Sequence, residues 1–446
     1  MRIAVIGAGW AGCTAAVDLA RRGHAVAVFE AGAVPGGRAR RVVRAGLPLD
    51  NGQHLLLGAY VETRRALALV HGDGVPPGLL SRQPLAIVPL APGRDALALR
   101  SRGGGTPGLA WALLRASGLR LSDRLGLLAW FARLASAGFR CPPDATVADL
   151  TATCPAAAAR ALLEPLCIAA LNTSPARASA RVFANVLRAA FAGPRGASDF
   201  LVAATDLSSL YADAALGLVV RAGGEVALRT RARLVAVSDD AVRLEVGRDE
   251  RLFDAVVVAT GPHQLADALA ETFAGAPALD AARLAAAALD YEPIATAWLG
   301  YAQRCPLPAP VLRLDDSPGQ WLFDRPDVLE RAQPDPARLP LAQLVSVVVS
   351  ASGPHDALDA PALARACDAQ LRRLAPGWPA LAFAQAITER RATYACTPTR
   401  PRPANALPHP RVALAGDWLD DAFPATLEAA VRTGFAAADR LVRGLA

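Results

Sequence analysis

The first thirty residues constrain the fold of this chain more than any other stretch. Residues 2–6 (RIAVI) form a short β-branched run that predicts a strand, and residues 24–29 (HAVAVF) predict a second one. A G-x-G-x-x-G turn separates the first strand from a predicted helix over residues 11–20. Strand, glycine turn, helix and strand in this order are typical of a dinucleotide-binding βαβ unit.

Each glycine of the turn has a separate physical task. Gly7 allows the tight turn, Gly9 leaves room for a pyrophosphate against the backbone, and Gly12 lets the helix pack close to the strand. The helix N-terminus then offers free N–H groups and a positive dipole end to the phosphates. Glu30, at the end of the second strand, can accept hydrogen bonds from a ribose diol. The unit therefore predicts a nucleotide site.

Two further glycine turns lie at opposite ends of the chain. A second glycine pair, ending at Gly37, is followed by Arg38. Near the C-terminus a predicted strand over residues 412–415 runs into Gly416 and Asp417. A glycine that ends a strand before a helix is where a backbone can approach a phosphate closely, so the turn at Gly416 is a second candidate for a nucleotide site.

The helix after Asp417 is predicted to begin at about Ala425, with Thr426 or Pro424 at its start. This two-ended pattern resembles the FAD-dependent amine oxidase and phytoene desaturase superfamily. The resemblance implies that the second glycine pair and its arginine lie along the pyrophosphate and that the late acid lies by the ribityl and phosphate portion. It also implies that the final helix points its N-terminus at the flavin ring, whose negative N1–C2=O locus such a terminus stabilises. The implied cofactor is FAD rather than NAD.

The order of the predicted elements indicates an α/β fold with an α+β substrate part. A Rossmann-like FAD-binding domain of the amine oxidase and phytoene desaturase type is expected to be discontinuous, over residues 1–80, 205–275 and 405–446. An interleaved substrate domain of antiparallel sheet plus helices is expected over 81–204 and 276–404, with 108–192 helical.

Within these domains, four further strands are predicted from the sequence. Residues 294–301 and 342–350 are predicted to belong to the antiparallel sheet, and 226–230 and 233–238 are predicted to form a strand pair. The superfamily often has valine at the position of Ala232, where it contacts adenine, so alanine is a small departure at an expected cofactor contact.

Composition bounds the compartment and the partners. The 446 residues are 53% hydrophobic and carry a formal net charge of +7, and the basic residues are all arginine, without one lysine. No aromatic-interleaved basic patch favours nucleic acid, whereas a basic surface fits anionic lipid. The seven cysteines show no C-x-x-C spacing, which suits a reducing cytosol and argues against a zinc site. We therefore expect no metal.

Targeting signals are also constrained by the sequence. Met1 runs directly into the first strand, which leaves no room for a signal peptide, and no run of eighteen uncharged apolar residues predicts a membrane span. We expect a cytoplasmic protein, either free or peripheral on the inner face of the cytoplasmic membrane. Oligomeric state is left open by the sequence.

The helical segment 108–137 allows two interpretations. Its apolar residues alternate with Arg115, Arg120, Arg124 and Arg133. One interpretation is an ordinary buried helix pair, and the other is a surface that docks on a membrane, because arginine and tryptophan flank the apolar face. The apolar residues in question are Trp111, Leu113, Leu114, Leu127, Leu128, Trp130 and Phe131.

Several longer segments resemble one branch of the superfamily, the squalene-associated, FAD-dependent hydroxysqualene dehydroxylases of bacterial hopanoid biosynthesis. The resemblance covers essentially the whole chain, with departures at Trp418, where tyrosine is commoner, and at Thr433, where serine is commoner. The segments that carry it are LDNGQHLLLGAY (49–60), PLCIAALNTSPARASARVFANVLRAAF (165–191), SDFLVAATDLSSLY (198–211), GQWLFDR (319–325), RATYACTP (391–398) and GDWLDDAFPATLEAAVRTG (416–434).

The resemblance implies a reaction on a long apolar isoprenoid. The allylic hydroxyl of hydroxysqualene would leave as water after protonation, and the N5 atom of reduced flavin would deliver hydride to the carbon, giving squalene. This chemistry needs an apolar tunnel, a proton donor, shielding from water and a rigidly held flavin. The electrons for FAD could come from a separate reductant or directly from a nicotinamide.

Two residues are candidates for the proton donor. His54 follows Gly52 and Gln53 in the segment expected beside the flavin ring, and a histidine near its normal pKa can act as a general acid. Asp324 could stay protonated if it were buried in an apolar pocket. The alternatives are a structural histidine bonded to backbone groups and, for Asp324, an ion pair with Arg325 or an acid that stabilises a turn.

Other residues of these segments have structural or supporting interpretations. Asp50 is expected to be a structural acid that holds its loop. Tyr291, Trp298 and Trp321 could line the pocket and stabilise a cation through their ring faces, or could belong to the core.

Competing functions share the same motifs. A carotenoid or polyprenyl desaturase would use the same fold and flavin, with hydride moving from the substrate to oxidised FAD. An amine oxidase of this superfamily usually holds a lysine near flavin N5, which this chain lacks. A non-catalytic FAD-bearing scaffold is a further alternative.

Overall fold

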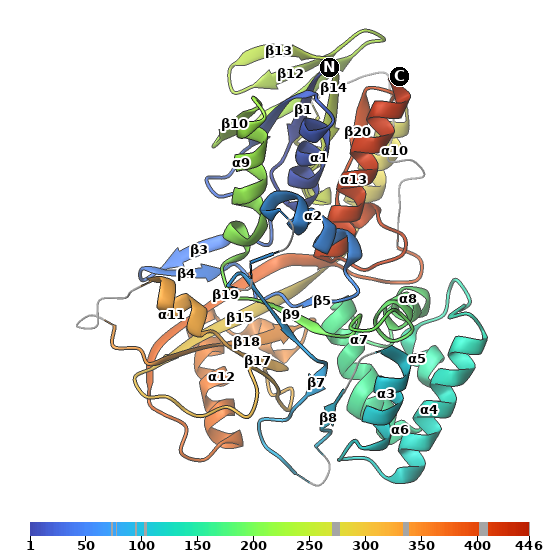
Figure 1. The fold of residues 1–446 in the computed structure, drawn as a ribbon, viewed down its shortest axis with the longest axis vertical. Helices are drawn as coiled ribbons and strands as arrows, with labels where there is room; N and C mark the ends of the chain where they lie inside the picture. The colour runs from blue at the N-terminus through green and yellow to red at the C-terminus, as the bar shows by residue number, and fades with distance from the viewer. Residues whose placement is uncertain are drawn as a thin grey trace.

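The computed structural model describes residues 1–72, 75–76, 78–93, 96–101, 105–269, 277–332, 339–400 and 409–445. Two lobes are stacked along the longest axis, and both termini lie at the far end of the first lobe (Figure 1). The predicted α/β fold with an α+β second part is confirmed.

The first lobe is built on a parallel sheet. Its strand order is β10-β2-β1-β14-β20, with every neighbouring pair parallel. The strands are β10 (Glu225–Leu228), β2 (Ala25–Glu30), β1 (Arg2–Ile6), β14 (Ala255–Val258) and β20 (Val412–Leu414). Strands from three distant parts of the chain therefore share one sheet.

Alternation along these strands assigns the two faces of the sheet. Ile3 and Val5 pack with the helices α1 (Trp10–Arg21), α9 (Asp213–Arg221) and α13 (Leu427–Gly444). Ala4 and Ile6 face the other way and join the core below a small antiparallel sheet. That sheet has the order β11-β12-β13, formed by β11 (Ala232–Val237), β12 (Val242–Val246) and β13 (Asp249–Phe253). Apolar residues on both faces are what a covered parallel sheet requires.

The second lobe contains an antiparallel sheet. Its order is β16-β17-β18-β15-β19, and β15 pairs along its length with both β18 and β19. The strands are β16 (Val311–Arg313), β17 (Trp321–Asp324), β18 (Gln343–Ser350), β15 (Tyr291–Tyr301) and β19 (Leu381–Tyr394). Helix α12 (Ala360–Leu374) covers one face, against Val345, Val347 and Val349. The predicted strands 294–301 and 342–350 are confirmed as direct antiparallel neighbours.

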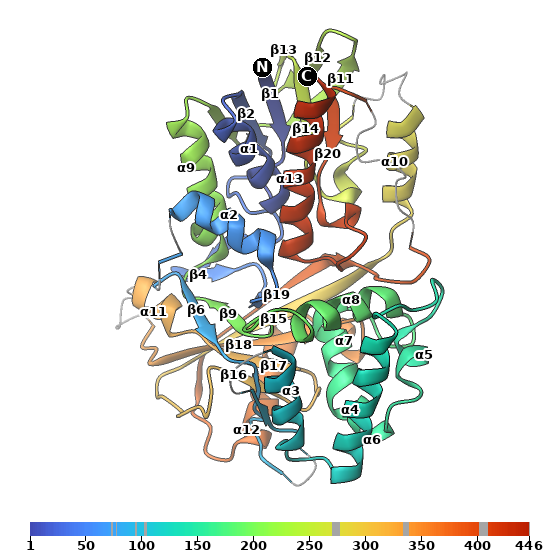
Figure 2. The same ribbon diagram turned by 45° about the vertical axis from the view of Figure 1, so that its right-hand side comes forward.

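A layer of helices stands beside this sheet (Figure 2). The predicted helical region 108–192 is confirmed as several helices separated by turns. They are α3 (Gly105–Leu114), α4 (Leu121–Ser136), α5 (Val147–Thr151), α6 (Ala156–Ala158), the π-helical turn η1 (Ala159–Leu163), α7 (Glu164–Leu171) and α8 (Ala180–Phe191).

Shorter elements connect the two lobes. The hairpin β3 (Arg41–Arg44) and β4 (Leu47–Asp50) lies between them, with α2 (Val61–His71) and the small sheet β5-β9-β6 nearby (Figure 1). That sheet consists of β5 (Leu56–Leu57), β9 (Phe200–Ala203) and β6 (Leu80–Gln83). The remaining elements are β7 (Ala86–Ile87), β8 (Leu99–Arg100), the π-helical turn η2 (Ser208–Ala212), α10 (Pro277–Ala287), α11 (Pro326–Ala332) and the short 3-10 turns η3 (Pro262–Gln264), η4 (Pro354–Ala357) and η5 (Asp417–Leu419).

One local prediction is wrong. Residues 226–230 and 233–238 do not pair with each other, because β10 joins the parallel sheet beside β2 while β11 pairs with β12. The turn between them carries the chain from one layer to the next, and a strand run alone does not specify which sheet completes its hydrogen bonds.

Candidate cofactor and active site

The glycine turn after β1 forms a bare backbone surface at the carboxyl edge of the parallel sheet. Gly7 has φ +101°, and a Cβ on Gly12 would lie 1.9 Å from the Gly7 carbonyl oxygen. Larger residues would therefore be strained at the first position and would clash at the second. Gly9 is the N-cap of α1, so the free N–H groups of the first turn open beside it.

The second glycine pair lies against this turn. Gly36 donates its backbone N–H to the Ala8 carbonyl at 2.8 Å, and Gly9 and Gly36 form a short parallel bridge. A Cβ on Gly37 would approach the Gly9 Cα to 3.3 Å. Two segments without side chains thus lie back to back, which is the backbone cradle that a pyrophosphate needs.

Glu30 lies at the end of β2 and supports the same turn. One carboxylate oxygen accepts the Ala8 N–H at 2.7 Å, and the other accepts the Gly32 N–H at 2.7 Å. Each oxygen keeps a further lone pair that can accept a hydroxyl. Thr230 donates its N–H to the Glu30 carbonyl, so Ala232, which is buried at the start of β11, lies close beyond the end of β2.

Arg38 and Asp417, from opposite ends of the sequence, form an ion pair. The Arg38 Nη2 lies 2.6 Å from the Asp417 Oδ1, and the Asp417 side chain is 5% exposed. The backbone N–H of Gly416 is held by the Thr433 hydroxyl at 3.0 Å. Thr433, which the sequence singled out only as a departure, therefore positions the late glycine.

The N-termini of two long helices meet at this edge. Because β1 and β20 are parallel and each leads into a helix, α1 and α13 begin on the same side of the sheet (Figure 1). Thr426 is the N-cap of α13, and its hydroxyl accepts the Ala429 N–H at 3.2 Å. Thr426 is therefore at the start of the final helix, as predicted. The helix itself begins at Leu427, two residues after the expected Ala425.

Buried polar atoms at the same edge have no partner among the described residues. They include the Trp10 Nε1 at the start of α1, the Thr260 Oγ1 after β14 and the Trp418 Nε1 after β20. Buried donors are normally satisfied, so these atoms, together with the bare glycine cradle, fit a site that holds a polar group such as a nucleotide cofactor.

Comparison with known proteins identifies the class of that cofactor. The family model described as "Flavin containing amine oxidoreductase" matches residues 10–442. The chain belongs to this family. It is a FAD-dependent oxidoreductase, as the sequence predicted.

Curated relatives within this family cover almost the whole chain. A protein of Rhodopseudomonas palustris named hydroxysqualene dehydroxylase is 30% identical over 98% of this chain and 97% of its own length. A protein of the same name from Sinorhizobium fredii is 29% identical with the same coverage. The resemblance stated from the sequence segments is thereby confirmed.

Several solved structures share the fold. An oxidoreductase from Methanosarcina mazei superposes with a TM-score of 0.74 at 15% identity, covering 98% of this chain and 100% of that one. Cyclohexylamine oxidase from Brevibacterium oxydans superposes with a TM-score of 0.69 at 17% identity, covering 100% of this chain and 99% of that one. At these identities the comparison establishes the architecture alone.

His54 lies in the segment that joins the two lobes of this flavin oxidoreductase. Its Nδ1 lies 2.7 Å from the Gly52 carbonyl oxygen, and burial lowers the pKa of the ring, with nearby Arg38 acting in the same direction. A neutral imidazole that donates Nδ1–H to Gly52 leaves Nε2 as an acceptor. The ring can therefore hold or pass on a proton at Nε2.

The loop that carries His54 is fixed to the antiparallel sheet by Gln53. The Gln53 N–H donates to the Thr296 hydroxyl at 3.1 Å, and its side-chain oxygen accepts the Ser346 hydroxyl at 3.0 Å. The same oxygen accepts Arg325 Nη1 at 2.7 Å. These three partners lie on β15, β18 and the end of β17, and sequence reasoning missed all of them.

Arg325 is the centre of a buried clamp. It is 1% exposed, and it contacts the Asp50 carboxylate at 3.4 Å and both oxygens of Asp327 at 2.9 and 3.0 Å. Asp50 also accepts the Leu207 N–H at 2.8 Å, which confirms its interpretation as a structural acid. Burial raises the pKa of Asp50 to about 6, although Arg325 and the Leu207 N–H lower it.

The structure does not bring Asp324 together with His54. Gln343 Nε2 approaches the Asp324 Oδ1 at 3.5 Å on the face of the sheet that α12 covers, whereas Arg325 points to the opposite face. Burial does raise the pKa of Asp324, as expected, but at a place remote from the His54 loop. The alternative ion pair between Asp324 and Arg325 is also wrong, because Arg325 pairs with Asp50 and Asp327 instead.

The aromatic candidates divide in two. Trp298 is fully buried below Arg325, whose guanidinium lies 5.3 Å from the ring centre, so this residue belongs to the core. Tyr291 and Trp321 are half-buried and pack against the hydrophobic core that continues into the helical layer. They stay candidates for a pocket wall.

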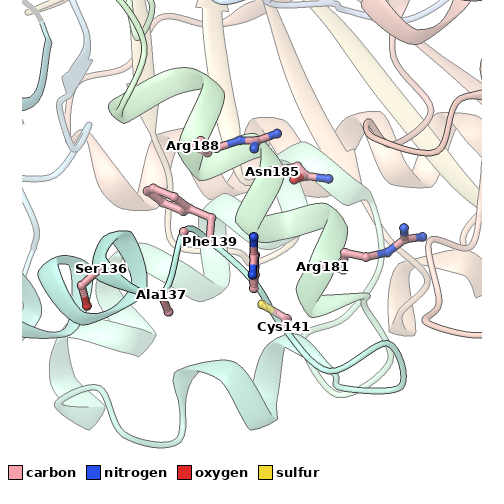
Figure 3. A pocket seen from close by; sticks show the side chains of 9 residues that line it. Ser136, Ala137, Phe139, Cys141, Arg181, Asn185 and Arg188 are labelled. Carbon is pink, nitrogen blue, oxygen red and sulfur yellow. The ribbon is translucent and has the colours of Figure 1, made fainter.

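A cavity with a volume of about 950 Å³ lies away from the cradle, between the C-terminal end of α4 and the helix α8 (Figure 3). Arg181, Asn185 and Arg188 project from one side of α8 into it. A second cavity, inside the helical layer, is lined only by leucine, isoleucine and phenylalanine.

Proposed function

We propose that this protein catalyses the FAD-dependent reductive dehydroxylation of hydroxysqualene to squalene. The observation that carries the proposal is similarity over the full length to proteins named hydroxysqualene dehydroxylase. The third of them, from Zymomonas mobilis, is 27% identical over 98% of this chain.

The reaction exchanges a hydroxyl group for hydrogen. The C–O bond of the allylic alcohol breaks, one proton joins the departing oxygen to make water, and a hydride forms the new C–H bond. When it is bound, reduced FAD supplies that hydride, and the protein must supply the proton, an apolar site and exclusion of water. One alcohol, one hydride and one proton thus give one squalene and one water.

The residues that would hold FAD come from three segments of the chain. The bare backbone of the glycine turns would receive the pyrophosphate, Glu30 the ribose, and Arg38 and Asp417 the phosphate and ribityl portion. Gly52 and Gln53 would lie beside the ring, and Ala232 beside the adenine. The proposed contacts are Gly7, Gly9, Gly12, Glu30, Gly37, Arg38, Gly52, Gln53, Ala232, Gly416, Asp417 and Thr426.

An apolar path toward His54 supports a long isoprenoid substrate. Leu55, the next residue, packs against the same hydrophobic core as Phe323 and Val348 on the inner face of the sheet. That core continues into the helical layer, where the second cavity lies. Apolar side chains along such a path bind a hydrocarbon chain by removing it from water.

His54 is the proposed proton carrier. Its Nδ1–H is held by Gly52, so Nε2 is the atom that would take up a proton and pass it to the hydroxyl oxygen. A ring whose pKa is lowered gives its proton up readily once it is charged, which favours transfer to a weakly basic alcohol.

An anaerobic turnover experiment tests this function. Purified protein loaded with FAD is chemically reduced and mixed with hydroxysqualene in detergent, and the products are followed by gas chromatography–mass spectrometry together with flavin absorbance. We expect squalene to appear in step with flavin reoxidation. His54→Gln should slow this step, whereas His24→Gln, in the turn between α1 and β2, serves as the matched control.

Two outcomes would contradict the proposal. Absence of squalene from flavin shown to be fully reduced would remove the dehydroxylase function. Formation of a new double bond in squalene or phytoene by the oxidised enzyme would instead establish the desaturase, in which hydride moves the other way.

A further inference from the structure

Exposed apolar side chains gather on the helices α3 and α4. Trp111 and Leu114 are 50% and 37% exposed, and Leu121 and Leu125 are 60% and 50% exposed. Of the twelve large hydrophobic side chains that are exposed among the described residues, these four lie within residues 111–125. A concentrated apolar surface of this kind marks a contact site.

The exposed surface continues along one side of α4. Leu121, Leu125, Ala129, Ala132 and Ser136 are spaced by three or four residues, and all are exposed. That spacing places them on one face of the helix. We call this stripe, together with Trp111 and Leu114, the α3–α4 face. The sequence-based interpretation as a buried helix pair therefore holds only for the opposite sides of these helices, where Leu113, Leu127 and Trp130 are buried.

The α3–α4 face carries an excess of positive charge. Between residues 111 and 125 the chain has three arginines, Arg115, Arg120 and Arg124, and one acidic residue, Asp123. The Arg115 guanidinium lies 4.9 Å from the centre of the Trp111 ring. Arg124 donates to the Leu114 and Leu119 carbonyls, which fixes α4 to the end of α3.

At its far end the face meets the cavity between α4 and α8. Ser136 belongs both to the stripe on α4 and to the lining of this cavity, which Arg140, Arg181 and Arg188 also line (Figure 3). No carboxylate lines the cavity, and within the described ranges none of these arginines forms an ion pair. Guanidinium groups in such a position suit a phosphate group.

We propose that the α3–α4 face docks on a bilayer containing anionic phospholipid, with a headgroup phosphate in the arginine-lined cavity. Apolar side chains bordered by tryptophan and arginine are the composition of a surface that lies in the bilayer interface. A second copy of the chain would bring like charges together, because the face is basic and the whole chain carries +7. Among the described residues no helix is long and apolar enough to cross a bilayer.

A route for the substrate follows, and this step rests on the proposed function. The second cavity lies directly behind the α3–α4 face, between Leu109 and Leu113 of α3 and Leu127 and Phe131 of α4. An isoprenoid dissolved in the bilayer would reach this cavity by passing between the two helices without crossing water. The cavity has a volume of only about 30 Å³, so α3 and α4 would have to move apart to admit the hydrocarbon. The docking surface itself does not depend on the identity of the substrate.

Co-sedimentation of the FAD-loaded protein with vesicles tests the docking surface. Vesicles of phosphatidylcholine with and without phosphatidylglycerol are compared at low and high salt. We expect binding to the phosphatidylglycerol vesicles that weakens as salt is raised. The double variant Leu121→Glu/Leu125→Glu should bind about tenfold more weakly, since it removes apolar contact and adds negative charge. Arg181→Gln/Arg188→Gln should weaken binding to the anionic vesicles only.

The control variant is Leu252→Glu/Leu284→Glu, which changes two leucines that are 60% and 66% exposed on other surfaces. The proposal would be overturned if the wild type did not bind the vesicles. It would also be overturned if both double leucine variants bound them as well as the wild type does. A dimer that Leu121→Glu/Leu125→Glu dissociates, without vesicle binding by the wild type, would assign the face to a second copy instead. Squalene formation in detergent is measured in parallel, so that failure of the proposed function is distinguished from failure of docking.

Discussion

The buried clamp around Arg325 allows a quantitative prediction. Replacing Arg325 with methionine keeps most of the side-chain volume but removes the donors to Asp50, Gln53 and Asp327. The three acceptors differ in the hydrogen-bond donors that they keep in the variant. Asp327 keeps Arg331 at 2.7 Å, and Gln53 keeps Ser346, but Asp50 keeps only the Leu207 N–H among the described residues.

The magnitude follows from the burial of Asp50, whose side chain is 2% exposed. Removing one partner of a buried ion pair costs about 3–5 kcal/mol, because the other charge is left without compensation. The pKa of Asp50 is already about 6, and without Arg325 it rises further, so the carboxyl takes up a proton near pH 7. Neutralisation limits the loss, and we expect the free energy of unfolding to fall by about 3 kcal/mol.

Urea denaturation of the FAD-loaded protein, followed by far-UV circular dichroism, measures this loss. The control is Arg251→Met, which removes an equally bidentate pair with Glu225 whose two side chains are 25% and 47% exposed. A surface pair of this kind contributes below about 1 kcal/mol. Adding Asp50→Asn to Arg325→Met should recover part of the loss. If Arg325→Met costs no more than Arg251→Met, the clamp does not stabilise the fold as argued.

Three further predictions concern the cradle and the clamp. Glu30→Ala should weaken FAD binding by about 1–3 kcal/mol, because a charge-assisted acceptor is lost, and equal FAD occupancy of mutant and wild type in a titration would reject that role. Thr426→Ala removes the cap of α13 and should lower the free energy of unfolding by about 1 kcal/mol in urea, whereas Thr230→Ala, in an exposed turn, should change it little. Asp50 has a folded-state pKa of about 6, above its ordinary value, so its contribution to stability is present at low pH and is lost as pH rises through 6. Between pH 5 and pH 8 the wild type should therefore lose about 1 kcal/mol relative to Asp50→Asn, and parallel pH profiles would contradict this assignment.

The cofactor lobe could be predicted from sequence because its signals are local. The glycines of the first turn and the cap at Thr426 each act on residues close to themselves in sequence, and backbone geometry specifies what they do. The family resemblance assigned Arg38 and Asp417 to the same cofactor, but they lie 379 positions apart, and their direct ion pair was not predicted.

The active-site loop could not be predicted to the same depth, because its contacts are long-range. Arg325 lies 275 positions from Asp50 and is adjacent in sequence to Asp324, the residue that was chosen. Successive side chains of a strand point to opposite faces of the sheet. Choosing Asp324 instead of its neighbour Arg325 therefore selected a side chain on the face opposite to the buried clamp. Sequence alone does not tell which face of β17 meets the loop.

The clamp also bears on how a substrate reaches His54. Asp50 ties the loop to Leu207, at the start of the π-helical turn before α9, while Gln53 ties it to Thr296 and Ser346 in the sheet of the second lobe. Opening the two lobes like a hinge would break the buried Asp50–Arg325 pair, at the cost estimated above. A route through the helical layer leaves all of these bonds in place. If the proposed function and the proposed docking surface are both right, the substrate would therefore enter between α3 and α4.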